Sequence, residues 1–240
     1  MKRILITGAN SYIGTSFEKY IKENFADKYE VDTVDMIDGS WREKFFSSYD
    51  VVYHVAGIAH SDNGKISAEK EKLYRSVNTD LTIETAKKAK ADGVKQFIFM
   101  SSAIVYGESG KIGHQKVITK DTPTNPANCY GDSKVQAELG ILPLNDESFK
   151  VVVVRPPMIY GKGSKGNFPQ LEKFAKLMNK TYNLSLNDII DAEDIVDYLC
   201  DHYDLAVGDI IYDLVIDLIN PFFNSYLKDS ILIYVLVIQD

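Results

Sequence analysis

The 240-residue chain carries 34 Asp and Glu against 27 Lys and Arg, a formal net charge of −7, with 45% hydrophobic and 25% charged residues. This composition is that of a globular protein with one large domain, or one domain and a smaller appendage, so disorder is excluded as the main state. The acidic balance argues against a nucleic-acid-binding surface, which needs a basic patch. Two cysteines, Cys129 and Cys200, make no disulfide framework and fit a reducing compartment.

Neither end of the sequence indicates export or membrane insertion. The first residues lead directly into a strand-like segment, without the apolar stretch and small-residue cleavage site of a signal peptide. The late apolar run, residues 231–238, is far shorter than the roughly 20 residues of a membrane span. We therefore expect a cytoplasmic protein with neither a membrane nor a nucleic acid as partner.

Up to about residue 155, short apolar runs alternate with longer amphipathic stretches, the pattern of a parallel α/β sheet. The predicted strands are 4–6, 31–35, 51–57, 96–100 and 151–154. The predicted helices are 14–24, 79–91 and 130–139, the second ending at Asp92 and Gly93. The fold class that follows is α/β, a doubly wound parallel sheet with helices on both faces.

The composition changes near residue 180. Residues 181–240 hold 12 Asp and Glu against one basic residue, Lys228, whereas residues 1–180 hold 22 acids and 26 bases. We therefore divide the chain into a domain at 1–178 and a small C-terminal region at 179–240. Residues 188–205 have one helical apolar face, but nothing beyond Gly208 is recognisable, so our hypothesis is a truncated or atypical C-terminus.

Residues 7–14 form a glycine turn at the end of the first predicted strand. Gly8 allows a tight strand-to-helix turn, and Gly14 allows close contact between helix and strand. Ser11 stands where a middle glycine often lies. Because the turn also opens a helix, whose N-terminus favours anions, it predicts a pyrophosphate-binding site and hence a dinucleotide-binding Rossmann unit. The alternative is an ordinary strand-to-helix loop.

Asp35 supports the dinucleotide interpretation and bears on the cofactor. It lies 21 residues after Gly14, at the end of the second predicted strand, where a carboxylate holds the ribose hydroxyls. A carboxylate would also repel a 2′-phosphate, and the next residue is Met36. The sequence therefore favours NAD over NADP, with NADP left open because Arg42 lies close in sequence.

Tyr130 and Lys134 lie one helical turn apart on one face. A free phenol, with a pKa of about 10, is a poor base at neutral pH, and a nearby cation favours its ionised form. The spacing alone is common, and a solvated helix face is its alternative explanation. The pair, however, opens the helix after the strand that ends at Ser101 and Ser102, and ligands lie at strand carboxyl ends in open α/β sheets. This position predicts an active site in which the Ser102 hydroxyl holds the substrate oxygen.

Taken together, these motifs resemble the extended short-chain dehydrogenase/reductases of the NAD-dependent epimerase/dehydratase type, and most of all the UDP-glucose 4-epimerase-like enzymes of bacterial polysaccharide synthesis. The resemblance spans about residues 1–178 and rests on the segments 7–14, 54–57, 77–78, 101–107, 130–134 and 155–161, together with Asp35. It implies an NAD-dependent enzyme acting on a nucleotide-sugar, with homodimerisation as a family expectation.

The resemblance also implies roles for particular residues. Tyr130 would take the sugar hydroxyl proton, Lys134 would lower the pKa of Tyr130 and bond the nicotinamide ribose, and Ser102 would hydrogen-bond the reacting oxygen. The residues expected to bind NAD are Gly8, Asn10, Ser11, Tyr12, Ile13, Gly14, Asp35, Val55, Ala56, Gly57, Asn78, Ser101, Tyr130, Lys134, Pro156 and Pro157. An epimerase would return the hydride to the other face of the keto-sugar.

Departures from the family narrow the reaction. The related sugar 4,6-dehydratases carry an Asp-Glu pair directly after the position of Ser102, but Ala103 and Ile104 stand here, which disfavours dehydration. Met158 replaces a common Asn, and the adenine contact within residues 38–42 stays unassigned. His54, His60 and His114 have no metal-ligand spacing, so no metal is expected. The alternatives to an epimerase are an NAD(P)H-dependent keto-sugar reductase and a dinucleotide-binding protein without turnover; the sugar and nucleotide stay open.

Overall fold

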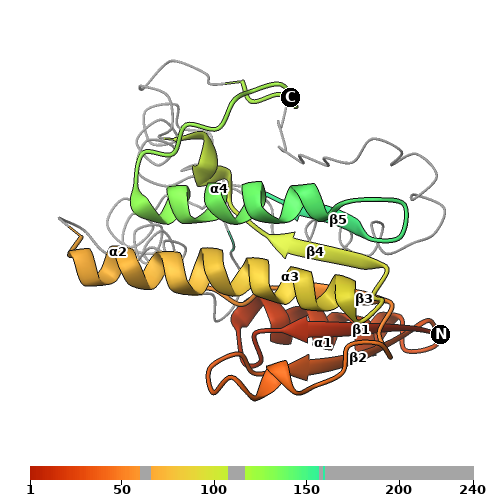
Figure 1. Cartoon of the computed structure of the whole chain (residues 1–240). Helices are drawn as coiled ribbons and strands as arrows, with labels where there is room; N and C mark the ends of the chain where they lie inside the picture. The colour runs from red at the N-terminus through yellow and green to blue at the C-terminus, as the bar shows by residue number, and fades with distance from the viewer. Residues whose placement is uncertain (60–65, 108–116, 157–158, 160–240) are drawn as a thin grey trace, which may run out of the picture.

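The computed structural model describes residues 1–59, 66–107, 117–156 and 159, which form a three-layer α/β unit (Figure 1). The strands are β1 (Lys2–Thr7), β2 (Tyr29–Val34), β3 (Val51–His54), β4 (Gln96–Met100) and β5 (Lys150–Val154). The α-helices are α1 (Tyr12–Asn24), α2 (Ala68–Tyr74), α3 (Leu81–Ala91) and α4 (Cys129–Ile141). Shorter helical segments are η1 (Ser40–Arg42), η2 (Arg75–Asp80), η3 (Ala103–Tyr106) and η4 (Leu142–Leu144).

The five strands form one parallel sheet in the order β2-β1-β3-β4-β5. All five predicted strands are present, each within a few residues of its expected bounds, so the predicted fold class is confirmed. The strand order reverses at β1, which lies between β2 and β3. In open α/β sheets a ligand binds at such a switch point, outside the strand carboxyl ends. Here those ends are Thr7 and His54.

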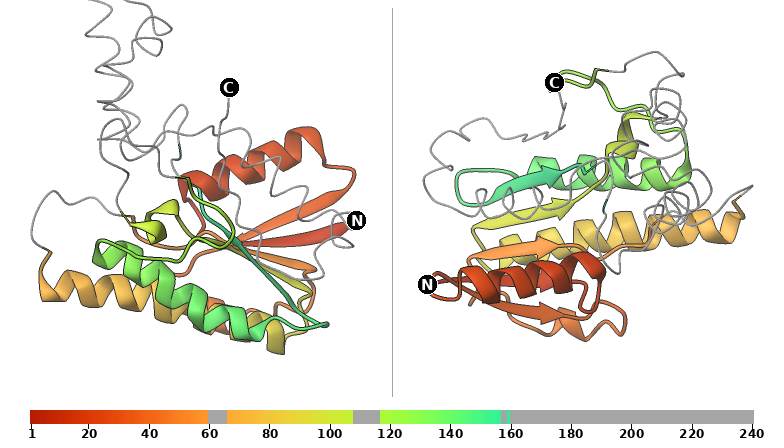
Figure 2. Two further views of the ribbon diagram at one scale, coloured as in Figure 1. Left: turned by 90° about the horizontal axis from the view of Figure 1, so that it is seen from above. Right: turned by 180° about the vertical axis from the view of Figure 1, so that it is seen from behind.

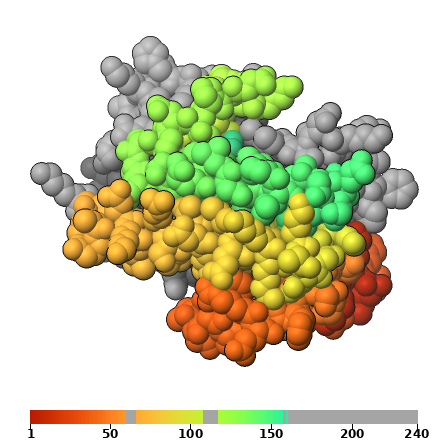
Figure 3. Space-filling model, viewed as in Figure 1, coloured from red at the N-terminus to blue at the C-terminus, as the bar shows by residue number. Residues whose placement is uncertain are grey.

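Two separate apolar layers bury the two faces of the sheet (Figure 2). On one face, Phe17 and Ile21 of α1 pack on Ile4 and Ile6, and all four side chains are fully buried. On the other, α3 and α4 lie side by side, as Figure 3 shows from their outer face, and cover the sheet with small or branched residues. Strands buried on both faces read as continuous apolar runs, which explains the valines of β5.

The second predicted helix starts earlier than its periodicity indicated. Instead of beginning at Thr79, helical structure runs from α2 through the π-helical segment η2 into α3. The predicted end is confirmed: Gly93 has φ +85°, and its N–H donates to the Lys90 carbonyl at 3.1 Å. π-helical turns often occur at functional sites, and this one brings Asn78 and Thr79 against α4.

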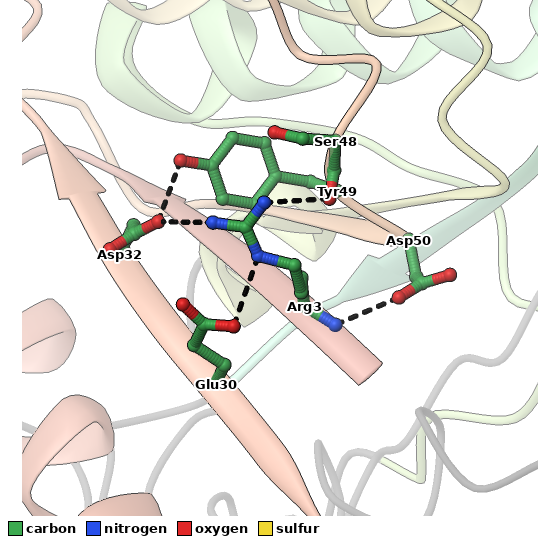
Figure 4. Close-up of polar contacts among 6 residues, drawn as sticks. All are labelled: Arg3, Glu30, Asp32, Ser48, Tyr49 and Asp50. Atoms are coloured by element: carbon green, nitrogen blue, oxygen red, sulfur yellow. Dashed lines mark hydrogen bonds and ion pairs between the residues drawn. The ribbon is translucent and has the colours of Figure 1, made fainter. Parts of the chain in front are cut away.

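The connection from β2 to β3 contains η1 and no strand, so β2 is the edge of the described sheet. A charged cluster holds the end of this connection against β1 and β2 (Figure 4). The Arg3 guanidinium donates to Glu30 at 3.1 Å and to Asp32 at 3.2 Å, and the Tyr49 hydroxyl donates to the same Asp32 carboxylate at 2.7 Å. The Arg3 N–H donates to Asp50 at 2.8 Å, immediately before β3 begins. The predicted boundary at residue 178, and the region after it, lie outside the described residues.

Candidate active site

The predicted pyrophosphate turn joins β1 to α1, as the motif requires. Gly8 has φ +106° and Asn10 has φ +64°, so the chain reverses through two left-handed residues. Ser11 does more than replace a middle glycine: it is the N-cap of α1, and its Oγ accepts from the Gly14 N–H at 3.0 Å. The first amides of a 13-residue helix therefore begin at a capped turn beside the carboxyl end of β1.

Both glycines of the turn are required by contact, and Gly8 is also required by its positive φ. A Cβ on Gly8 would lie 2.8 Å from the Ala56 backbone nitrogen, and one on Gly14 would lie 2.7 Å from the Ser11 Oγ and 3.2 Å from a methyl carbon of Ile6. Gly8 thus brings the β1 turn against the end of β3, and Gly14 brings α1 against β1.

We expect Gly8→Ala to destabilise the protein more than Gly93→Ala. Both positions have positive φ, but no atom lies within 4 Å of a Cβ built on Gly93, so that variant carries backbone strain alone, about 1–2 kcal/mol. Gly8→Ala adds a collision with backbone atoms that cannot rotate away. Urea unfolding of both variants measures the difference, and equal free energies of unfolding would contradict the tight β1–β3 contact.

Asp35 directly follows β2 and is exposed, and its Oδ1 accepts from the Ile37 N–H at 2.8 Å. Arg42, which kept NADP as an alternative cofactor, is paired with Glu84. Its Nε and Nη2 donate to the two Glu84 carboxylate oxygens at 2.5 and 2.6 Å. Its guanidinium also lies over the Trp41 ring. Trp41, the middle residue of η1, is fully buried. The guanidinium of Arg42 is therefore held by Glu84, and the Asp35 carboxylate by the Ile37 N–H.

The end of β3 places a small-residue segment beside the turn. Val55 is half-buried, Ala56 is buried and Gly57 is exposed. Asn78 lies fully buried behind Gly57, where its carboxamide accepts from the Ile58 N–H at 2.9 Å and donates to the Ile58 carbonyl at 3.1 Å. Asn78, predicted to bind the cofactor, therefore fixes the backbone of the segment that borders the site.

Ser101 and Ser102 follow β4 but point into different surroundings. Ser101, expected at the cofactor, is buried, and its hydroxyl donates to Glu138 at 2.5 Å. Ser102 caps η3, accepting from the Ile104 N–H at 3.3 Å, and hydrogen-bonds the Tyr130 phenol. The predicted Ser102–Tyr130 proximity is therefore present in the structure.

Tyr130 is the second residue of α4, and its ring lies 5.9 Å from that of Tyr74. Burial raises the pKa of Tyr130, and the Ser102 hydrogen bond opposes this while Tyr74 adds to it. The expected direction was the reverse, a lowering by Lys134. The physical reason is desolvation: a phenolate loses more by leaving water than one hydroxyl donor returns. Tyr74 was not foreseen, and no spacing in the sequence singles it out.

Lys134 is buried between the ends of two strands. Its Nζ donates to the Met100 carbonyl at 3.0 Å, at the end of β4, and lies 3.3 Å from where a Gly57 Cβ would be, at the end of β3. Burial lowers the pKa of Lys134 to about 8, with the Glu138 carboxylate acting in the opposite direction. Lys134 is therefore mostly protonated at neutral pH, and it reaches the same strand ends as Tyr130.

The pKa of Lys134 predicts how stability depends on pH. A lysine in the unfolded chain keeps its proton up to a pKa of about 10.4, so between about pH 8 and about pH 10 the unfolded state binds more protons than the folded one. The free energy of unfolding should rise across that window. Lys134→Met should reduce the rise, whereas Lys19→Met, at an exposed α1 position, should keep it. Urea unfolding at several pH values checks both, and an unchanged rise in Lys134→Met would refute the assignment.

A buried ion pair beneath the site was not predicted from the sequence. Glu138 and Arg155 form an ion pair with side-chain exposures of 3% and 6%, and the Arg155 Nη1 donates to the Tyr106 hydroxyl at 2.5 Å. Glu138 lies four residues after Lys134, so their shared helix face was a readable signal. Pro156, expected at the cofactor, is buried and its carbonyl accepts from Ala103; Pro157 and Met158 lie outside the described residues.

Within the described ranges, no group of three or more His, Cys, Asp or Glu side chains could hold a metal ion. In the same residues, no helix combines the length and apolar character needed to cross a bilayer. His60 and His114 lie outside these ranges, and His54 is buried under the β1 turn.

The site thus defines a class: an α/β protein with a dinucleotide-type turn, and with a Ser-Tyr-Lys group at the carboxyl ends of β3 and β4. Comparison with known proteins gives the family. The sequence model of the NAD dependent epimerase/dehydratase family matches residues 4–199, and the chain belongs to this family of enzymes.

A curated relative extends the similarity over most of the sequence. UDP-glucose 4-epimerase from Vibrio cholerae is 33% identical over 255 aligned residues, covering 92% of this chain and 77% of the relative. This alignment reaches well beyond residue 178. The C-terminal region, in which the sequence motifs beyond Gly208 matched no family pattern, is therefore in large part alignable to a family member.

Solved structures agree on the fold. UDP-glucuronic acid 4-epimerase from Bacillus cereus, in complex with NAD, superposes with a TM-score of 0.55 at 21% identity, covering 68% of this chain and 59% of that one. RMD from Pseudomonas aeruginosa, complexed with NADPH, gives a TM-score of 0.60 at 21% identity, covering 78% and 64%. The chain spans about three fifths of the length of these structures.

Proposed function

We propose that the protein is an NAD-dependent nucleotide-sugar epimerase of the UDP-hexose 4-epimerase type, with Ser102, Tyr130 and Lys134 as its reacting group. The observation that carries the proposal is the convergence of these three side chains at the carboxyl ends of β3 and β4, next to the glycine turn. The similarity to the Vibrio cholerae UDP-glucose 4-epimerase supports this choice of reaction.

The residues present fit a dinucleotide. The capped N-terminus of α1 and the turn around Asn10 offer backbone N–H groups and a favourable dipole to a pyrophosphate. Asp35 is exposed at the end of β2, where ribose hydroxyls would be held, and the small residues Ala56 and Gly57 leave room for close approach. The chemistry that bound NAD supplies is reversible hydride transfer.

The protein's own residues manage the proton and the orientation. Tyr130 would accept the proton of the sugar hydroxyl, and Ser102, already bonded to the phenol, would hydrogen-bond the same oxygen. Lys134, protonated at neutral pH and lying beside Gly57, would hold the ribose and favour the phenolate. Because burial raises the pKa of Tyr130, the positive charges gathered at the site in the complex are needed to bring the phenol into working range.

Dehydration of the sugar is disfavoured by the residues after Ser102. Ala103 and Ile104 open η3, and neither side chain can donate or accept a proton. The second candidate reaction is reduction of a keto-sugar, which uses the same three residues and would consume the reduced cofactor.

Incubation of the full chain with catalytic NAD and either UDP-glucose or UDP-galactose tests the proposal. We expect interconversion of the two sugars without net formation of NADH, followed by nuclear magnetic resonance of the anomeric protons. Stoichiometric oxidation of NADH with a keto-sugar would instead establish a reductase. Calorimetry that shows NAD binding, but neither UDP-, GDP- nor dTDP-sugar binding or turnover, would leave only dinucleotide binding and refute the epimerase.

Asp35 should determine the choice between NAD and NADP. Replacement by Ser removes the negative charge at the end of β2, and we expect the NADP affinity to rise relative to NAD by about tenfold, which corresponds to about 1.4 kcal/mol. Asp38→Ser is the matched control, because that exposed carboxylate is used by its own turn with Ser40. Fluorescence titration with NADH and NADPH measures the ratio, and an unchanged ratio in Asp35→Ser would remove Asp35 from the ribose site.

A further inference from the structure

His54, the last residue of β3, lies in a fully buried chain of hydrogen bonds that no proposed chemical step uses. Its Nδ1 lies 2.6 Å from the Thr7 hydroxyl, and its Nε2 lies 3.0 Å from the Thr82 hydroxyl. All three residues are 0% exposed, and the imidazole stacks on Phe97. Buried polar groups that all have hydrogen-bond partners fix a unique arrangement of the elements they join.

The contacts assign the protons along this chain. The single hydroxyl proton of Thr82 is donated to the Asn78 carbonyl at 2.8 Å, so toward His54 the Thr82 oxygen can only accept. His54 therefore carries its proton on Nε2. A neutral imidazole has one N–H, which leaves Nδ1 as an acceptor from the Thr7 hydroxyl. Full burial and the nearby Lys134 charge lower the pKa of His54 to about 3, in agreement with a neutral ring.

The two ends of the chain reach the two halves of the candidate site. Thr7 immediately precedes Gly8, the first glycine of the cofactor turn. At the other end, the Asn78 carboxamide donates to the Ser133 hydroxyl at 3.1 Å, and that hydroxyl donates to the Tyr130 carbonyl at 2.7 Å. These contacts therefore link His54 to both the cofactor turn and the first turn of α4.

We propose that His54 is a positioning residue, held as the neutral Nε2–H tautomer, that fixes the cofactor turn relative to the helix carrying Tyr130 and Lys134. The role at the reaction rests on the proposed function, whereas the tautomer and the coupling between the two ends do not. His54 is fully buried. Among the described residues it touches neither the reacting atoms nor the protein surface.

The first test is spectroscopic and needs no activity. Long-range proton–nitrogen correlation spectra of the ¹⁵N-labelled protein should show one histidine protonated on Nε2 and bare on Nδ1, unchanged from about pH 8 to about pH 5. The chain has four histidines, so His54→Phe identifies the signal by its loss. Protonation on Nδ1, or on both nitrogens near pH 6, would overturn the proposal.

The second test is a mutant cycle on Thr7→Val and Thr82→Val. In wild type, each should lower kcat about tenfold with KM nearly unchanged, and the two together should lower it by clearly less than the product, because either one interrupts the same chain. In the His54→Phe background, each should have at most about a twofold effect. The coupling would be refuted if the two threonine substitutions lowered kcat by the product of their single effects in wild type. It would also be refuted if each lowered kcat as much in His54→Phe as in wild type.

Two further variants keep the test decisive if His54→Phe fails to fold. His54→Asn places an acceptor toward Thr7, and His54→Gln places a donor toward Thr82. Each variant keeps one of the two hydrogen bonds and should lose most of the coupling. The same mutant cycle is also measured on the NADH affinity, from the quenching of the fluorescence of the single tryptophan, Trp41. Coupling in NADH affinity without sugar turnover would leave the positioning role in place and refute only the proposed epimerase activity.

Discussion

Tyr130→Phe is expected to lower the rate of UDP-sugar interconversion by about 10²–10⁴-fold, the usual contribution of a positioned proton-transfer group. The substitution removes the hydroxyl that hydrogen-bonds Ser102 at the end of β4 and keeps the ring that packs beside Tyr74. The NAD affinity should stay within about threefold, because the turn and Asp35 are untouched. Steady-state rates with calorimetric NAD binding measure both.

Tyr74→Phe is the matched control. Its ring packs 5.9 Å from that of Tyr130, and its hydroxyl donates to the Ala59 carbonyl at 3.3 Å. Loss of that hydrogen bond should change the stability by about 1 kcal/mol and leave turnover within a few-fold. If both variants retained wild-type rates, Tyr130 would not be the proton-transfer group. If both lost activity equally, burial of the pair rather than the Tyr130 phenol would control the reaction.

Arg155→Met is expected to destabilise the fold by about 3–5 kcal/mol, because it leaves the Glu138 carboxylate buried without its ion-pair partner. Two nitrogens of Arg155 donate to Glu138, and a third donates to the Tyr106 hydroxyl. The pair joins the residue after β5 to the last third of α4, one helical turn beyond Lys134. Urea unfolding measures the loss.

The exposed Arg42–Glu84 pair is the matched control for Arg155. It has comparable carboxylate geometry, but side-chain exposures of 49% and 46%. Glu84→Gln should therefore cost less than about 1 kcal/mol. If the Arg155 and Glu84 variants were equally stable, the buried pair would contribute no more than a surface one. Arg155→Lys should recover only part of the stability, since an ammonium cannot reproduce the three hydrogen bonds of the guanidinium to Glu138 and Tyr106.

The sequence by itself determined the sheet and the residues at its switch point. Continuous apolar runs such as those of β4 and β5 are typical of strands covered on both faces, so the runs located these two strands within a residue. The glycines and Asp35 were readable because spacing relative to a strand end is a local property. The i, i+4 spacing placed Tyr130 and Lys134 together for the same reason.

Only the tertiary structure decided how those residues are surrounded. The direction of the Tyr130 pKa shift depends on burial and on Tyr74, which approaches from α2, and the burial of Asn78 depends on the π-helical turn. The His54 chain joins Thr7 to Thr82, and the Arg155–Glu138 pair joins β5 to α4. Such contacts between distant segments leave no periodic trace in a sequence, because they are set by where packed elements meet and by which polar groups burial then forces to pair.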